Sequence, residues 1–182
     1  MTGAIGPASP LDRILGAVID GAGAVAAVCG FALVLVVGGN VLLRYMLGTG
    51  SVGFQELEWH LISPIALLGM SYGMRHGAHV RVDVLYDRLG PATQAAIDTV
   101  AAILMGAMAV AMILLSLPYV QQSIGMMEGS PDPGGLPWRF ALKAFIPLGF
   151  AILVLQALAQ AMMSARQCRA ALAAAASAGG RP

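Results

Sequence analysis

The stretch that decides the fold is GAGAVAAVCGFALVLVVGGNVLL, at residues 21–43. It carries no charged side chain, and Asn40 is its one strongly polar residue. A helix needs roughly 20 apolar residues to cross the hydrocarbon core of a bilayer, which is about 30 Å thick. This stretch is therefore predicted to span a membrane. Its apolar run exceeds the 7–15 residues of a signal-peptide core, so we expect it to be retained.

Three further apolar runs follow, at about residues 54–74, 99–120 and 144–165. Lipid cannot hydrogen-bond to exposed backbone groups, and the runs are too long for barrel strands. All four runs are therefore predicted to be transmembrane helices. The sequence thus predicts an all-α integral membrane protein.

The composition of the 182-residue chain agrees with this class. It is 58% hydrophobic and 10% charged, with a mean hydropathy of +0.80. A soluble domain carries about 25% charged residues. A net charge of +1 gives no basic surface for nucleic acid. Cys29 and Cys168 form no pattern typical of a metal site or a disulfide framework.

The distribution of Lys and Arg predicts the orientation. With four spans, both termini and the middle loop share one side, which holds seven of the ten basic residues. These are Arg13, Arg75, Arg81, Arg88, Arg166, Arg169 and Arg181, against Arg44, Arg139 and Lys143 on the other side. Cytoplasmic loops carry the excess of basic residues, so both termini are predicted to be cytoplasmic. We expect an N-terminal tail at 1–12, a membrane domain at 13–165 and an alanine-rich tail at 166–182.

The second run opens with a polar turn. Glu56, Trp59 and His60 share one helical face by their i, i+3, i+4 spacing, and Glu58 points elsewhere. The uncharged remainder, 61–74, gives only about 21 Å of helix. The turn is therefore expected near or just inside the outer interface, where it could be hydrated or pair with a cation such as Arg44.

Three interpretations of this turn stay open. It could be an interfacial first turn, where acids suit the helix dipole and Trp59 joins the aromatic belt. It could contact a partner protein, or mark an ion or proton path. No charged residue lies between His60 and Arg75, so a relay has no visible continuation. Haem ligation by His60 lacks a second ligand at matching depth.

Two features follow along the chain. Gly69, Gly73 and Gly77 are spaced by four, a pattern typical of close helix packing, within this chain or against another. Residues 79–89 alternate polar and apolar side chains like a strand, but they also suit a short amphipathic interfacial segment, which we expect here. Metal binding by His76, His79 and Asp83 is weakly supported. No catalytic motif or phosphate-binding loop occurs, so we expect neither an enzyme nor a cofactor.

The loop before the fourth run contains Pro131, Pro133, Gly134, Gly135 and Pro137. Prolines and adjacent glycines predict a fixed turn rather than a free linker. On the outer face, such a loop is a plausible docking surface.

These features occur together in a known order over about residues 13–165. The motifs are Arg44-Tyr45, Gln55-Glu56, Leu68-Gly69, His79-Val80-Arg81-Val82-Asp83, Glu128 with Ser130, Gly134-Gly135-Leu136-Pro137, and Ile146-Pro147-Leu148-Gly149-Phe150. The chain resembles the small membrane subunit of tripartite ATP-independent periplasmic (TRAP) transporters, the DctQ-like family. Many members open the second span with two adjacent acids, whereas only Glu56 of that doublet is present here.

The resemblance implies a scaffold subunit in the bacterial inner membrane. Its partners would be a large DctM-like permease, which holds the substrate and sodium sites, and a periplasmic solute-binding protein that delivers a solute, often an organic acid. The candidate partner-contact or structural residues are Arg44, Glu56, Trp59, His60, Gly69, Gly73, Gly77, His79, Arg81 and Asp83. The competing hypotheses are a free-standing channel or carrier using Glu56 and His60, and a membrane enzyme or redox subunit using the histidines.

Overall fold

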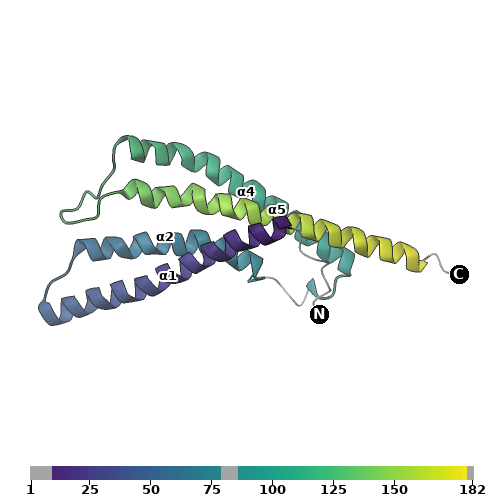
Figure 1. Ribbon diagram of the computed structural model, residues 1–182, viewed down its shortest axis with the longest axis horizontal. Helices are drawn as coiled ribbons and strands as arrows, with labels where there is room; N and C mark the ends of the chain where they lie inside the picture. Colours follow the sequence, from purple (N-terminus) through teal and green to yellow (C-terminus); the bar gives the residue numbers. More distant parts are fainter. Residues whose placement is uncertain (1–9, 79–85, 180–182) are drawn as a thin grey trace.

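The computed structural model describes residues 10–78 and 86–179. Within these ranges the chain forms four long helices (Figure 1). They are α1 (Pro10–Leu47), α2 (Val52–Arg75), α4 (Pro91–Gly125) and α5 (Arg139–Gly179). The prediction of four helices in an all-α chain is therefore confirmed.

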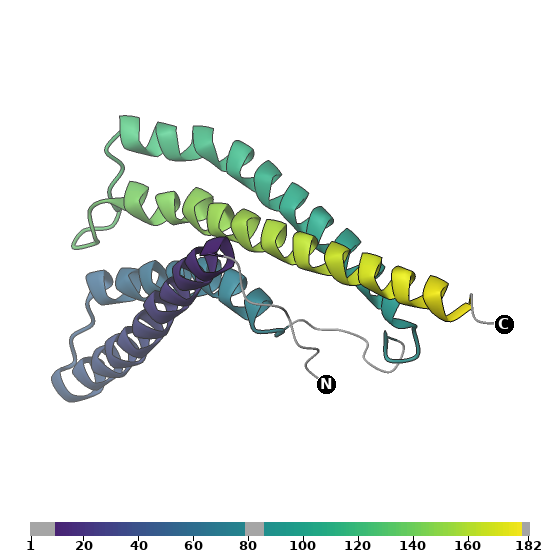
Figure 2. The ribbon, with the colours of Figure 1, turned by 45° about the vertical axis from the view of Figure 1, so that its right-hand side comes forward.

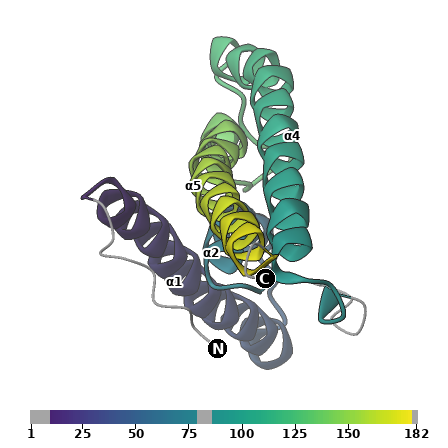
Figure 3. The same ribbon diagram turned by 90° about the vertical axis from the view of Figure 1, so that its right-hand side faces the viewer.

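The helices lie in an open row rather than a closed bundle. The pairs α1–α2 and α4–α5 each form a hairpin, and α2 packs against α5 to join the two hairpins. Helix α1 touches α5 only slightly. The view along the long axis shows α1 and α4 on opposite sides of the α2–α5 pair (Figure 3). In Figure 2, α1 splays away from α5. The outer helices therefore keep most of their surface free of contacts within the chain.

Three of the described helices are long and apolar enough to cross a membrane: Asp12–Leu47, Pro91–Gly125 and Arg139–Ala174. Their most apolar windows are only 11, 17 and 22% buried inside the chain. Exposed apolar surface on this scale indicates a multi-pass membrane protein. Helix α2 is not among the three, and its first two turns carry Glu56 and Glu58. A second span at 54–74 remains a prediction.

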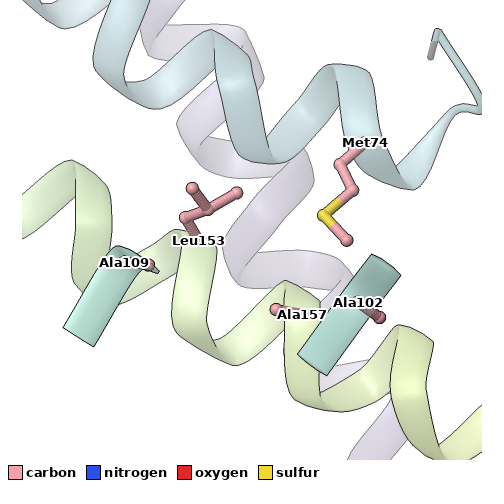
Figure 4. Packing of buried hydrophobic residues seen from close by; sticks show 5 residues of the cluster. All are labelled: Met74, Ala102, Ala109, Leu153 and Ala157. Carbon is pink, nitrogen blue, oxygen red and sulfur yellow. The ribbon is translucent and has the colours of Figure 1, made fainter. Parts of the chain in front are cut away.

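Small side chains line the contact between α4 and α5. Ala102 and Ala109 of α4 meet Leu153 and Ala157 of α5, and Met74 of α2 joins the same cluster (Figure 4). Alanine lets helix backbones approach closely, which is how membrane helices gain packing energy without a hydrophobic driving force. A second cluster, of Ala22, Ala26 and Leu68, joins α1 to α2. Both clusters place α2 in the middle of the molecule.

The helices are longer than the apolar runs that predicted them. Helix α1 begins at Pro10 and α5 continues to Gly179, so both extend into segments predicted as tails. The reason is that a helix does not end where its apolar part leaves the membrane. The predicted interfacial segment lies largely in residues 79–85, outside the described residues.

Candidate functional site

The hydrogen bonds at the C-terminal end of α4 set the direction in which the loop between α4 and α5 begins. The Glu128 N–H donates to the Ser123 carbonyl over 3.0 Å, and the Met127 N–H donates to the Ile124 carbonyl over 2.9 Å. These two bonds form a Schellman motif. Met127 takes the left-handed conformation of that motif, with φ 45°, where glycine is usual. The motif turns the chain sharply and brings Glu128 back toward the last turn of α4.

A tight turn follows at Asp132–Gly135. The Gly135 N–H donates to the Asp132 carbonyl over 3.0 Å, and Gly134 has φ 81°. Proline at the second position and glycine with positive φ at the third are typical of a type II turn. The Ser130 N–H donates to the Leu136 carbonyl over 3.1 Å and closes the loop. The predicted fixed turn is therefore present.

The carboxylate of Glu56 holds this loop against α2. Glu56 is 1% exposed, accepts a hydrogen bond from the Leu136 N–H over 2.6 Å, and accepts a second from the Ser130 hydroxyl. The guanidinium of Arg139 lies 3.6 Å away. A buried charge is tolerated only when it is paired and hydrogen-bonded, and Glu56 meets both conditions. A Cβ on Gly135 would meet the Ser130 side chain first and would lie 2.8 Å from the Glu56 carboxylate, so glycine leaves room for this close approach.

Arg139 is the cation at this site, and the expected partner Arg44 is not. The Arg139 guanidinium also lies 5.6 Å from the centroid of the Trp59 ring, close enough for a cation–π contact. The face that Glu56 and Trp59 share is thus occupied by one guanidinium. Arg44 was suggested because it lies close to Glu56 in the sequence. The loop between α4 and α5 folds back onto α2 and places Arg139 beside Glu56 instead.

A second ion pair secures the other end of the loop. Lys143 pairs with Glu128, and the Ser123 hydroxyl donates to the same carboxylate over 2.6 Å. The ammonium of Lys143 lies 4.0 Å from the Tyr119 ring centroid. The hydrogen bonds from Lys143 and then Ser123 lower the pKa of Glu128 below its ordinary value of 4.5. The loop therefore has one carboxylate fixing it to α2 and another fixing it to α4 and α5.

Glu58 and His60 face elsewhere. The Asn40 amide of α1 donates to Glu58 over 3.2 Å, as expected for a residue off the Glu56 face. His60 Nδ1 lies 2.6 Å from the Glu56 backbone carbonyl, which only accepts, so Nδ1 is the donor. The other ring nitrogen, Nε2, is buried without a hydrogen-bond partner among the described residues. His60 thus contacts the backbone of Glu56 rather than its carboxylate.

The glycine triplet divides into two roles. Gly77, with φ 71°, ends α2: the Ala78 N–H donates to the Gly73 carbonyl over 2.9 Å, a second Schellman bond. A Cβ on Gly69 would meet nothing within 4 Å, and one on Gly73 would meet only Ala78, at 3.8 Å. Gly69 and Gly73 therefore pack against no other helix within the described chain.

The close helix approaches are made by other glycines. Gly23 of α1 lies against the ring of Tyr72, and Gly149 of α5 lies against Leu67. A Cβ on Gly149 would be 2.6 Å from Leu67 Cβ and 2.9 Å from its carbonyl oxygen. Spacing alone did not single out either glycine.

The remaining predicted residues add little to the site. Arg44 lies exposed in the last turn of α1. His79, Arg81 and Asp83 lie outside the described residues. Across residues 10–78 and 86–179, no group of three His, Cys, Asp or Glu could hold a metal ion.

The fold and the site define a class of protein: a multi-pass membrane subunit whose polar side chains fix a loop at one end of its helices. The family model for the DctQ component of the tripartite ATP-independent periplasmic transporters matches residues 33–167. The chain belongs to this DctQ family, as its motifs predicted. The family is a transporter component rather than an enzyme family.

A curated relative agrees with this assignment. The chain is 30% identical over 118 residues to the ectoine TRAP transporter small permease protein TeaB of Halomonas elongata. The match covers 64% of this chain and 60% of the relative, so the chain spans less than two thirds of that protein's length. The chain is therefore a TRAP small permease component.

Proposed function

We propose that this chain braces a large permease subunit in the bacterial inner membrane and does not itself translocate the solute. The large subunit would hold the substrate and sodium sites. A periplasmic binding protein would deliver the solute, for which an organic acid is the first candidate. The chain would cross the membrane four times with both termini in the cytoplasm, an orientation that the seven-to-three distribution of basic residues supports.

The observation that carries this proposal is that no charged residue continues the polar turn of Glu56, Glu58 and His60 deeper into α2 or interrupts the other three predicted spans. The segments 21–43, 61–74, 99–125 and 144–165 contain no Asp, Glu, Lys or Arg. Ion and proton paths through membrane proteins are marked by ionisable side chains inside the bilayer. A chain without them is suited to packing and support, with translocation in another subunit.

The contacts of Glu56 also favour a brace over an ion site. Its carboxylate is already engaged by Ser130, Leu136 and Arg139. The alternative, a free-standing channel or carrier using Glu56 and His60, would require this carboxylate to leave those partners. We propose instead that the loop it holds is a docking surface for the other components, and that the open α2 face at Gly69 and Gly73 receives a helix of the large subunit.

Reconstitution tests the proposal directly. The chain would be placed in proteoliposomes alone, and together with a large DctM-like permease subunit from the same organism, with and without a periplasmic binding protein. Uptake of radiolabelled organic acids and of ectoine would be measured with an imposed sodium gradient. We expect uptake only with the complete set and the sodium gradient. Uptake by this chain alone would establish the channel alternative.

Glu56→Gln distinguishes a carboxylate that holds the loop from one on an ion path. Glu58→Gln is the matched control, because among the described residues the Glu58 carboxylate is hydrogen-bonded to the Asn40 amide of α1 rather than to the loop. We expect Glu56→Gln to speed hydrogen exchange at the Leu136 amide and to reduce the amount of large subunit that co-purifies. Glu58→Gln should change both less. Full assembly of the Glu56→Gln complex without transport would instead indicate an ion path.

A further inference from the structure

One face of α5 combines exposed apolar side chains with two arginines. Leu148, Leu155, Leu158 and Met162 are each between 39 and 56% exposed. Arg166 and Arg169 follow at helical spacing on the same face and are also exposed. The opposite face buries Leu153, Ala157 and Ser164. The exposed face is therefore a continuous apolar strip that ends in positive charge.

These two arginines are available to a ligand. Across residues 10–78 and 86–179, neither has an ion pair or a side-chain hydrogen bond. By contrast, Arg75 pairs with Asp20 at 3.2 Å, Arg139 with Glu56 at 3.6 Å, and Lys143 with Glu128. Arg166 and Arg169 thus lack the acidic partners that these other basic residues have found.

The position of the pair along α5 matches a bilayer boundary. From Lys143 to Arg166 the helix rises about 35 Å, at 1.5 Å per residue. The hydrocarbon core is about 30 Å thick, so basic side chains at the two ends of this stretch would reach opposite headgroup regions. Helix α5 then continues past the ends of α1 and α2 (Figure 1). The arginines lie where the apolar strip would leave the membrane.

We propose that Arg166 and Arg169 bind the phosphate of an anionic phospholipid, whose acyl chains lie along Leu158 and Met162. The guanidinium group matches phosphate oxygens in a bidentate geometry, and anionic lipids attract basic residues at the membrane surface. The apolar strip favours a phospholipid over free phosphate, because only the lipid has acyl chains that can pack against it. The proposal rests on the membrane placement of α5 given under the proposed function.

Native mass spectrometry of the full chain from mixed micelles tests this site. Phosphatidylglycerol and phosphatidylcholine of equal chain length would compete for binding. We expect a preference for phosphatidylglycerol of about fivefold per arginine, from the attraction of one basic residue to an anionic surface. The double variant Arg166→Gln/Arg169→Gln should lose most of this preference. Arg13→Gln/Arg88→Gln removes two exposed charges from the same predicted side and should keep it.

Four outcomes would overturn the proposal. Equal loss in both double variants would mean that only net charge matters. Displacement of the lipid by millimolar inorganic phosphate would mean that the site binds free phosphate. Loss of the large subunit from the Arg166→Gln/Arg169→Gln variant, with lipid preference unchanged, would assign the arginines to an acidic protein partner. A complex that assembles and transports without lipid preference would refute this site and leave the proposed function standing.

Discussion

Gly149 of α5 lies directly against Leu67 of α2, and replacing it tests how the two hairpins are joined. A Cβ added by Gly149→Ala would lie 2.6 Å from Leu67 Cβ, 2.9 Å from the Leu67 carbonyl oxygen and 3.1 Å from its carbonyl carbon. Two of these atoms belong to the backbone and cannot turn aside as a flexible side chain does. The substitution therefore forces the helices apart.

The cost follows from these distances. Carbon atoms in ordinary contact lie about 3.5–4.0 Å apart, so α2 and α5 must separate by roughly 1 Å. Overpacking of this kind costs about 1–3 kcal/mol. Replacing glycine by alanine within a helix stabilises the folded state by about 0.5–1 kcal/mol, because alanine has less conformational freedom to lose when the chain folds. We expect Gly149→Ala to lower the free energy of unfolding by about 1–2 kcal/mol.

The matched control is Gly69→Ala, because a Cβ there meets nothing within 4 Å. Unfolding of the isolated chain would be followed by circular dichroism as sodium dodecyl sulfate is titrated into dodecyl maltoside micelles. We expect Gly69→Ala to be neutral or stabilising and Gly149→Ala to unfold at lower detergent fraction. Equal stability of the two variants would refute the reasoning that the close approach, rather than glycine content, sets the cost.

Two further predictions concern the helix end and the loop. Gly77→Ala should destabilise α2 by about 1 kcal/mol, since an L-residue is disfavoured at φ 71°, whereas Gly73→Ala should be near neutral; the same detergent titration compares them. Glu128 has a pKa lowered by Lys143 and Ser123, so its stabilising effect is full above 4.5 and is lost as the pH falls through the lower folded value. Thermal unfolding of Glu128→Gln should therefore differ from that of the unchanged chain at pH 7 and approach it in acid, and a gap that stays constant from pH 7 to 3 would contradict this.

The helices could be predicted from the sequence because the membrane imposes a length and a polarity on every span. The helix ends could not. The apolar run predicted the first helix from residue 21, whereas α1 begins at Pro10. Hydropathy reports where a helix meets lipid, and a polar helix can continue beyond that boundary. At the end of α2, the glycine spacing indicated Gly77 only as a packing residue, and in the structure it takes the positive φ of a helix cap.

The site could be predicted only in part for a similar reason. The sequence singled out Glu56, since an acid in the first turns of a predicted membrane helix is unusual. Its partners Ser130 and Leu136 lie 74 and 80 residues further along the chain. Which cation completes the site depends on how the loop folds back. Residue types at a membrane boundary indicate that a polar contact is needed, but only the rotation and packing of the helices decide which residues make it.

Polar contacts hold the helices together at the two ends of the molecule, and apolar surface lies between these ends. At one end, Glu56 and Glu128 bind the loop to three helices. At the other, Asp20 of α1 pairs with Arg75 of α2. Between these ends the helices meet through alanine and glycine and leave most of their apolar surface uncovered. Helices in lipid gain no hydrophobic energy from meeting, so such a chain keeps its shape through its ends and presents its sides to lipid or to another subunit. That division suits a brace, because a support must hold its own geometry while its sides stay available for contact.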